Sequence, residues 1–229
     1  MRVATFTLSI SDPAARRLTV MRPADHAAAI GQTAPLFVLP AIDGGTVALD
    51  SYRGRRHVIV WFSRGFTCAF CRNYIDRILD GYGTLLASET ELIQVAPNLV
   101  EGAREFFAPA PLPYPFVCDP DKRLYAVYGL GSLGALEATR AAVVSFSHAF
   151  ATGGSGAQMR GAWLDVVNRN FIRRLHHHAT SALEQGLFLV DKEGIVRHRI
   201  IVGPLDPIPS AAVLAGLVTT YCGNDSHPA

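Results

Sequence analysis

Two cysteines separated by two residues, Cys68 and Cys71, are the side chains of this sequence best suited to chemistry. They follow the apolar run Val58–Phe62 and precede a stretch in which apolar residues have helical spacing. Thiols at the start of a helix meet unpaired backbone N–H groups and the positive end of the helix dipole, and both lower the pKa of a thiol. Two thiols at this spacing can also close a small disulfide ring. The pair therefore predicts a redox-active dithiol.

Zinc binding is the alternative, because a Cys-x-x-Cys pair is also half of a common zinc site. The run His176–His178 would have to supply further ligands, but consecutive helical residues point about 100° apart and cannot all bind one ion. With Arg173 and Arg174, these histidines are better explained as a cationic helix end. The second paired-ligand spacing of a zinc site is missing, so the redox interpretation is favoured.

Four residues beside the pair are candidates for assisting it. Arg64 and Arg72 would each stabilise a thiolate, since a nearby cation favours the charged form of a thiol. The alternative is that both arginines are solvated. Thr67 or Ser63 would cap the following helix and fix its first turn.

The other two cysteines are expected to be structural. Cys118 ends a predicted strand and Cys222 lies near the C-terminus, although Cys118 is also a candidate for a remote resolving thiol. Four cysteines with one close pair do not make a disulfide framework, so a reducing cytosol is the expected compartment.

The elements that must position the pair alternate between strands and helices. Predicted strands cover Leu36–Leu39, Thr46–Leu49, Val58–Phe62, Leu92–Ala96, Tyr114–Cys118, Leu187–Val190 and Ile195–Ile201. Predicted helices follow the cysteine pair as far as Gly81 and cover Val100–Phe107, Leu124–Tyr128 and Ser210–Tyr221. The first two strands flank the turn 43–45 and make a hairpin, as do the last two around 191–194. This alternation predicts an α/β fold with a mixed sheet.

The helix after the cysteine pair is predicted to be amphipathic. One face is apolar and carries Phe70, Tyr74, Ile75, Ile78 and Leu79. The opposite face is polar and carries Arg72, Asn73, Asp76 and Arg77. A helix of this pattern packs its apolar face on a sheet.

One domain, residues 31–222, is expected between an N-terminal arm (1–30) and a C-terminal tail (223–229). Residues 131–186 exceed what the alternating pattern requires and are predicted to be a helical insertion. Its two helices, Leu136–Phe150 and Trp163–Leu175, flank a glycine cluster at 153–156. Packing on the sheet is the first interpretation, and a cover over the site or a dimer contact are the alternatives.

Composition narrows the class of protein. The chain has 229 residues, of which 49% are hydrophobic and 17% charged, with a formal net charge of +2. This balance predicts neither a nucleic-acid partner nor a membrane surface. No run of 18 apolar residues and no apolar leader pattern is present, so no export or membrane anchoring is expected.

Several motifs occur together in a recognisable order. They are Gly31–Phe37, Tyr52–Gly54, Phe62–Gly65, Cys68–Arg72, Asp119–Asp121, Tyr128–Leu130 and Gly186–Arg197. In this order they resemble the thioredoxin-like superfamily and, within it, peroxiredoxin-like proteins of the AhpC/TSA group, over roughly residues 31–217. The resemblance implies a thioredoxin-like fold, with a mixed central sheet flanked by helices, an N-terminal hairpin and a helical insertion. It implies no metal or organic cofactor.

Two alignments with relatives of this kind assign the cysteines differently. Aligned with peroxiredoxins, Cys71 takes the place of the peroxide-attacking cysteine, Cys68 that of the loop threonine, Arg64 that of the proline and Gln185 that of a distant arginine. Aligned with thioredoxins, Cys68 is the attacking and Cys71 the resolving thiol. The chain thus resembles the peroxiredoxin-like proteins that carry Cys-x-x-Cys in place of Thr-x-x-Cys.

The resemblance implies a thiol-dependent oxidoreductase, with hydroperoxides as the first expected substrates. One thiolate of Cys68 and Cys71 would attack and the other would resolve, with Arg64 and Thr67 assisting. A thioredoxin- or glutathione-type reductant would close the cycle, and a homodimer is compatible with this class. Two alternatives stay open: a reductase of protein disulfides, and a non-enzymatic module for redox sensing or interaction.

Overall fold

A five-stranded sheet forms the centre of the computed structural model, which describes residues 28–66, 69–131, 183–202 and 208–223. The strand order is β5-β4-β3-β6-β7. The strands are β3 (His57–Phe62), β4 (Thr90–Ala96), β5 (Phe116–Cys118), β6 (Gln185–Val190) and β7 (Val196–Val202). β3, β4 and β5 run parallel, while β6 and β7 pair antiparallel. The predicted mixed sheet is therefore confirmed.

β3 is the middle strand because five of its six residues, Val58–Phe62, form a continuous apolar run. It pairs with β4 on one side and β6 on the other, and all six of its residues are buried. A strand buried on both faces needs this kind of continuous apolar run, whereas a half-exposed strand alternates. The residues that follow β3 consequently start from the buried centre of the sheet.

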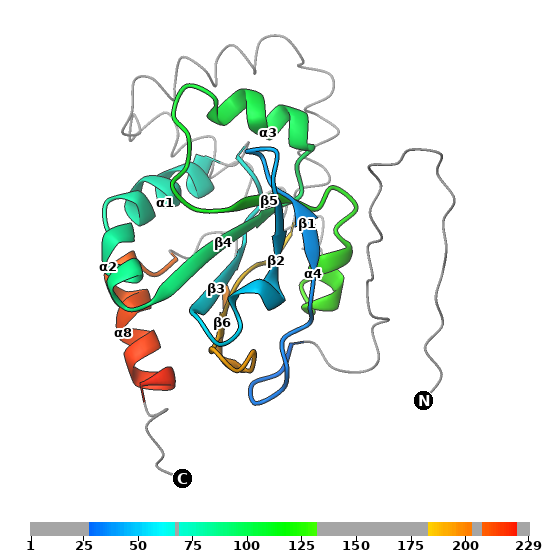
Figure 1. The fold of residues 1–229 in the computed structure, drawn as a ribbon. Coiled ribbons are helices and arrows are strands. Elements are labelled where there is room, and N and C mark those ends of the chain that lie inside the picture. The colour runs from blue at the N-terminus through cyan, green and yellow to red at the C-terminus, as the bar shows by residue number, and fades with distance from the viewer. Residues whose placement is uncertain (1–27, 67–68, 132–182, 203–207, 224–229) are drawn as a thin grey trace, which may run out of the picture.

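The two faces of the sheet carry separate apolar cores. The helices and strands around the sheet can be followed in Figure 1. One face is covered by α1 (Ala69–Leu79), α2 (Tyr82–Ala87), α3 (Val100–Phe107) and α8 (Ala211–Cys222). The other is covered by the hairpin of β1 (Val38–Pro40) and β2 (Thr46–Ala48), by the short helix η1 (Leu49–Tyr52) and by α4 (Arg123–Val127). Helices on both sides of a mixed sheet are the layered arrangement that the alternating sequence pattern predicts.

Turn residues account for the two hairpins. Gly44 has φ +95°, and the Asp43 carboxylate accepts a 2.8 Å hydrogen bond from the Gly45 N–H, so the predicted first turn is confirmed. In the second hairpin, buried Asp191 accepts a 2.7 Å hydrogen bond from Ile195 N–H and pairs with Arg197. Both polar turns therefore satisfy backbone groups that strand pairing leaves over.

Two details depart from the sequence predictions. A further helix, α2, follows α1 directly, because Gly81 ends the first helix without ending the helical region. Leu79, expected on the buried face of α1, is 37% exposed, since it is the last residue of that helix. The predicted helices of the insertion, most of the tail and most of the N-terminal arm lie outside the described residues, so these predictions stay untested.

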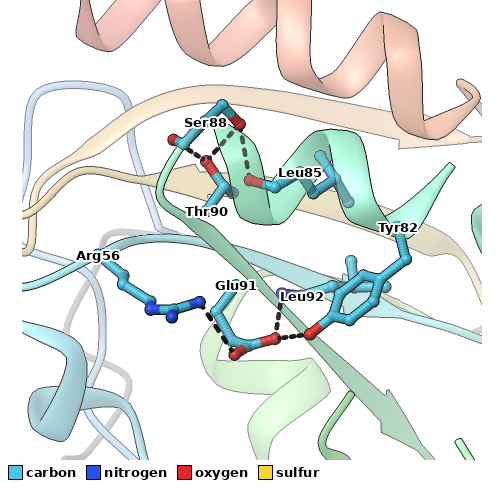
Figure 2. Close-up of polar contacts among 7 residues, drawn as sticks. All are labelled: Arg56, Tyr82, Leu85, Ser88, Thr90, Glu91 and Leu92. Carbon is cyan, nitrogen blue, oxygen red and sulfur yellow. Dashed lines mark hydrogen bonds and ion pairs between the residues drawn. The ribbon is translucent and has the colours of Figure 1, made fainter. Parts of the chain in front are cut away.

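A polar cluster fastens α2 to the amino end of β4 (Figure 2). The Tyr82 hydroxyl donates to the Glu91 carboxylate, which also accepts a 3.1 Å hydrogen bond from Leu92 N–H. The Arg56 guanidinium lies 3.9 Å from the same carboxylate. Because the chain leaves β3 for the cysteine helix at the opposite end of the sheet, this cluster is part of the scaffold.

None of the helices in the described ranges is both long enough and apolar enough to cross a bilayer.

Candidate redox site

The candidate site lies at the carboxyl edge of the parallel strands. β3 ends at Phe62, and the loop Ser63–Phe66 leads towards α1. Cys71 is the third residue of α1, so its backbone belongs to the first helical turn, as the sequence predicted. Cys68 and Thr67 lie outside the described residues. The described geometry of the site is therefore that of the loop and the start of the helix.

A buried serine anchors the beginning of the loop on the face of the sheet that α1, α2, α3 and α8 cover. Ser63 Oγ donates a 3.2 Å hydrogen bond to Val95 O and accepts from Gln94 Nε2 at 3.1 Å and from Gly65 N–H at 3.3 Å. The Gln94 amide oxygen in turn accepts a 3.2 Å hydrogen bond from the Tyr114 hydroxyl. Neighbouring strands are thus connected to the loop by a chain of buried polar groups.

The same serine is held from the opposite face. Tyr125, on α4, directs its hydroxyl at the carbonyl oxygens of Ser63 and Val95, the latter at 3.0 Å. Ser63 N–H also donates to Val95 O at 2.9 Å, which extends the pairing of β3 with β4 by one residue. Buried backbone groups at the end of a strand need such partners, and here the two layers supply them together.

The second half of the loop is held by Asn98. Phe66 N–H donates to Asn98 Oδ1 at 3.3 Å, and both residues are buried. The Phe66 ring stacks on Phe106 of α3 at a centroid distance of 4.6 Å. Gly65 lies between these anchors with φ +89°, a conformation that residues with a side chain rarely adopt.

Arg64, four residues before Cys68, has a buried side chain. It is only 5% exposed, and no other arginine or lysine among the described residues is buried. The alternative that Arg64 is solvated is therefore wrong. Arg64 belongs to the loop Ser63–Phe66, so a buried guanidinium side chain is part of the segment that leads to the cysteines. The side chain of Arg72 lies outside the described part of the structure.

Ser63 does not cap α1, contrary to one of the two predictions for that role. Its hydroxyl accepts from Gly65 N–H, and Ser63 precedes the first residue of α1 by six positions. An N-cap must lie directly before the helix to reach the amides of its first turn. The prediction for Thr67 falls outside the described residues.

Gln185 begins β6 and is fully buried. The next residue, Gly186, pairs with Phe62, so Gln185 faces the end of β3. This is the place that alignment with peroxiredoxins gives to a distant arginine. A neutral amide stands there instead, which leaves Arg64 as the buried cation of this edge.

The remaining cysteines are buried thiols. Cys118, at the end of β5, is 2% exposed, and burial followed by the charge of Glu101 raises its pKa to about 12. Cys222, at the end of α8, is also buried. A thiol with so high a pKa is a poor nucleophile at neutral pH, because the thiolate is the reactive form. This supports a structural role and speaks against Cys118 as a resolving thiol.

A central mixed sheet, helices on both faces and a helix that starts beyond the carboxyl end of the middle strand define a thioredoxin-like fold. Residues 30–149, just over half of the chain, match the model of the AhpC/TSA family. The chain belongs to that family.

Known relatives agree with this assignment. A protein named as a peroxiredoxin in two strains of Mycobacterium tuberculosis is 31% identical over 99 residues, which are 43% of this chain and 62% of the relative. The match thus spans less than two thirds of that relative. Peroxidoxin BcpB of M. tuberculosis has a TM-score of 0.54 at 13% identity, over 86% of this chain and 98% of its own. Reduced 2-Cys peroxiredoxin of Plasmodium vivax has a TM-score of 0.58 at 13% identity, over 86% and 99%.

Sequence reasoning missed the residues that hold the loop. Gln94, Asn98, Tyr114 and Tyr125 come from segments far apart in the chain, and no spacing rule connects them to the cysteines. One signal was available, since Gln94 is the polar residue of the otherwise apolar predicted strand Leu92–Ala96. Such a residue needs a buried partner and therefore marks a contact with another element.

Proposed function

We propose that this protein is a thiol-dependent oxidoreductase in which Cys68 and Cys71 form a redox pair that reduces hydroperoxides. Membership of the AhpC/TSA family, together with a Cys-x-x-Cys pair whose second cysteine, Cys71, belongs to the first turn of α1, carries the proposal. The amides of the first turn of α1 and the charge of Arg64 both favour a thiolate at this edge of the sheet.

The reaction has two steps. One thiolate attacks the terminal oxygen of the hydroperoxide, which breaks the O–O bond, gives a sulfenic acid and releases an alkoxide that takes up a proton to become an alcohol or water. The second thiol then attacks the sulfenic sulfur, forms the Cys68–Cys71 disulfide and releases water. The thiol pair loses two electrons and the peroxide gains them.

Arg64 is proposed to favour the thiolate and the developing charge on the leaving oxygen. Thr67 is proposed to cap α1 and so to fix the first helical turn, which contains Cys71. The peroxiredoxin alignment makes Cys71 the attacking thiol and the thioredoxin alignment makes it Cys68. Single substitutions separate these two assignments.

An external dithiol or thiol must reduce the disulfide after each turnover. A thioredoxin-type or glutathione-type reductant in the cytoplasm suits this requirement, because both exchange thiols with exposed disulfides. The likeness to a 2-Cys peroxiredoxin also makes a homodimer compatible with the proposal.

The test is the rate at which the fully reduced protein consumes hydrogen peroxide in stopped flow. Cys68→Ser, Cys71→Ser and the double variant are compared with Cys118→Ser, the buried-thiol control. The proposal predicts rapid consumption that the double variant abolishes and the control retains. A rate equal to that of a free thiol in the wild-type protein would contradict it.

Reduction of protein disulfides is the second candidate, because Cys-x-x-Cys meets the requirement of that reaction as well. The same variants decide between the two when a model disulfide replaces peroxide. Fast disulfide reduction with slow peroxide consumption would transfer the assignment to this second activity. If neither reaction depends on the pair, a non-enzymatic sensing or interaction role takes its place.

A further inference from the structure

Gln94 is the centre of a buried chain of hydrogen bonds that reaches the loop leading to the cysteines. Its side chain is fully buried on β4, between the Tyr114 hydroxyl at 3.2 Å and Ser63 Oγ at 3.1 Å. Every other residue of β4 that faces this core is apolar or hydroxyl-bearing, so an amide here is unusual in its surroundings. Burying an amide is unfavourable unless hydrogen bonds replace those it made with water.

The effect of this chain on the loop is direct. Ser63 Oγ receives the Gln94 donor and, with the same oxygen, the Gly65 N–H at 3.3 Å. Losing the Gln94 side chain therefore removes one of the bonds that hold Ser63 Oγ where Gly65 can reach it. The Gln94 contact supports the loop backbone between β3 and the cysteines.

We propose that Gln94 is a positioning residue for the dithiol, which acts through Ser63 on the Ser63–Phe66 loop and sets how readily the Cys68–Cys71 disulfide closes. This inference rests on the proposed function. A short disulfide ring closes well only when the backbone on both sides of it is held in place, because ordering that backbone otherwise opposes ring closure. The Gln94–Ser63 bond supplies this order on the β3 side, while α1, which contains Cys71, supplies it at the second cysteine.

Equilibration of the full-length protein with glutathione tests the proposal, with the fraction of Cys68–Cys71 disulfide measured by mass spectrometry. Gln94→Met removes both polar atoms and nearly conserves the volume, and Ser63→Ala removes the other partner of the bond. Thr90→Val is the matched control. Thr90 is equally buried on β4, but its hydroxyl bonds Ser88 O at 2.9 Å, at the end of the strand away from the loop.

The expected result is an equilibrium constant for disulfide formation that falls about fivefold in Gln94→Met, the size of one net hydrogen bond. The constant should fall by a similar factor in Ser63→Ala. It should fall little further in the double variant, because both substitutions remove the same contact. Thr90→Val should stay within twofold of the wild type even though it lowers the melting temperature.

An unchanged constant in Gln94→Met and Ser63→Ala, or an equal fall in Thr90→Val, would overturn the inference and leave the proposed function standing. If Gln94→Met does not fold, Ser63→Ala against Thr90→Val gives the same decision. A wild-type protein that forms no Cys68–Cys71 disulfide at any glutathione ratio removes the proposed function, and this inference with it.

Discussion

The amide oxygen of Asn98 occupies the space that a side chain at position 65 would need. A Cβ atom built on Gly65 would lie 2.2 Å from Asn98 Oδ1, the oxygen that accepts the hydrogen bond from Phe66 N–H. Gly65 also has φ +89°, so glycine is required there for two separate reasons. The loop before the cysteines therefore has one tightly determined path.

Gly65→Ala is predicted to damage both the fold and the site. The substitution adds a left-handed backbone cost of about 1–2 kcal/mol to an overpacking cost of about 1–3 kcal/mol. Gly44→Ala is the matched control, because Gly44 has φ +95° but no atom within 4 Å of its Cβ position. Chemical unfolding should show the larger loss for Gly65→Ala, and only that variant should slow peroxide consumption. Equal losses of unfolding free energy in the two variants would show that the Asn98 side chain can move aside at little energetic cost.

Tyr125→Phe is predicted to loosen the loop from the α4 side. The variant loses the hydroxyl that bonds Ser63 O and Val95 O, at a cost of about 1 kcal/mol or somewhat more. Tyr128→Phe is its control, since that hydroxyl donates to Pro35 O at 2.9 Å, away from the loop. Both variants should unfold at lower denaturant concentration. A similar change of thiol reactivity in the two would contradict a specific role for Tyr125.

The sequence predicted the elements that depend on local apolar patterns, but not the contacts between residues far apart in the chain. Apolar periodicity identified β3, α3 and the two hairpins, because burial in strands and helices follows short repeats. α2 was missed since its six residues offer too little pattern. The Gln94–Ser63 and Asn98–Phe66 contacts join residues about 30 positions apart, and only the folded sheet brings them together. For the same reason, the burial of Arg64 could not be deduced from its neighbours.

Cys118 is predicted to be inert towards thiol reagents in the native protein. With a pKa of about 12, roughly one thiol in 10,000 is ionised at pH 8. Iodoacetamide at that pH should modify Cys68 and Cys71 while Cys118 and Cys222 react only after unfolding. Fast native labelling of Cys118, located by peptide mass spectrometry, would contradict its buried environment.

The raised pKa of Cys118 also predicts a pH dependence of stability. A thiol that ionises near pH 9.0 when unfolded and near 12 when folded contributes stability that is fully present below pH 9 and is lost as the pH rises through this window. The difference in unfolding free energy between the wild type and Cys118→Ala should therefore shrink above pH 9. A difference that grows with pH would mean that folding lowers the pKa of Cys118, which contradicts the prediction.

The Tyr82–Glu91 cluster in Figure 2 is predicted to matter for stability alone. Tyr82→Phe should lower the unfolding free energy by about 1 kcal/mol, because the Glu91 carboxylate loses one donor but keeps Leu92 N–H and Arg56. Peroxide consumption at 25 °C should stay at the wild-type rate, since the cluster lies at the end of the sheet away from the cysteine loop. A slower reaction in a fully folded variant would show coupling between the two ends.

The most direct test of the redox pair is to map the bond that forms when the reduced protein meets one equivalent of hydrogen peroxide. After rapid acid quench, alkylation and proteolysis, mass spectrometry assigns each of the four cysteines to a free thiol, a sulfenic acid or a disulfide. The proposed function predicts a Cys68–Cys71 disulfide within one protein chain, with Cys118 and Cys222 still reduced. Oxidation that leaves Cys68 and Cys71 as free thiols would contradict it.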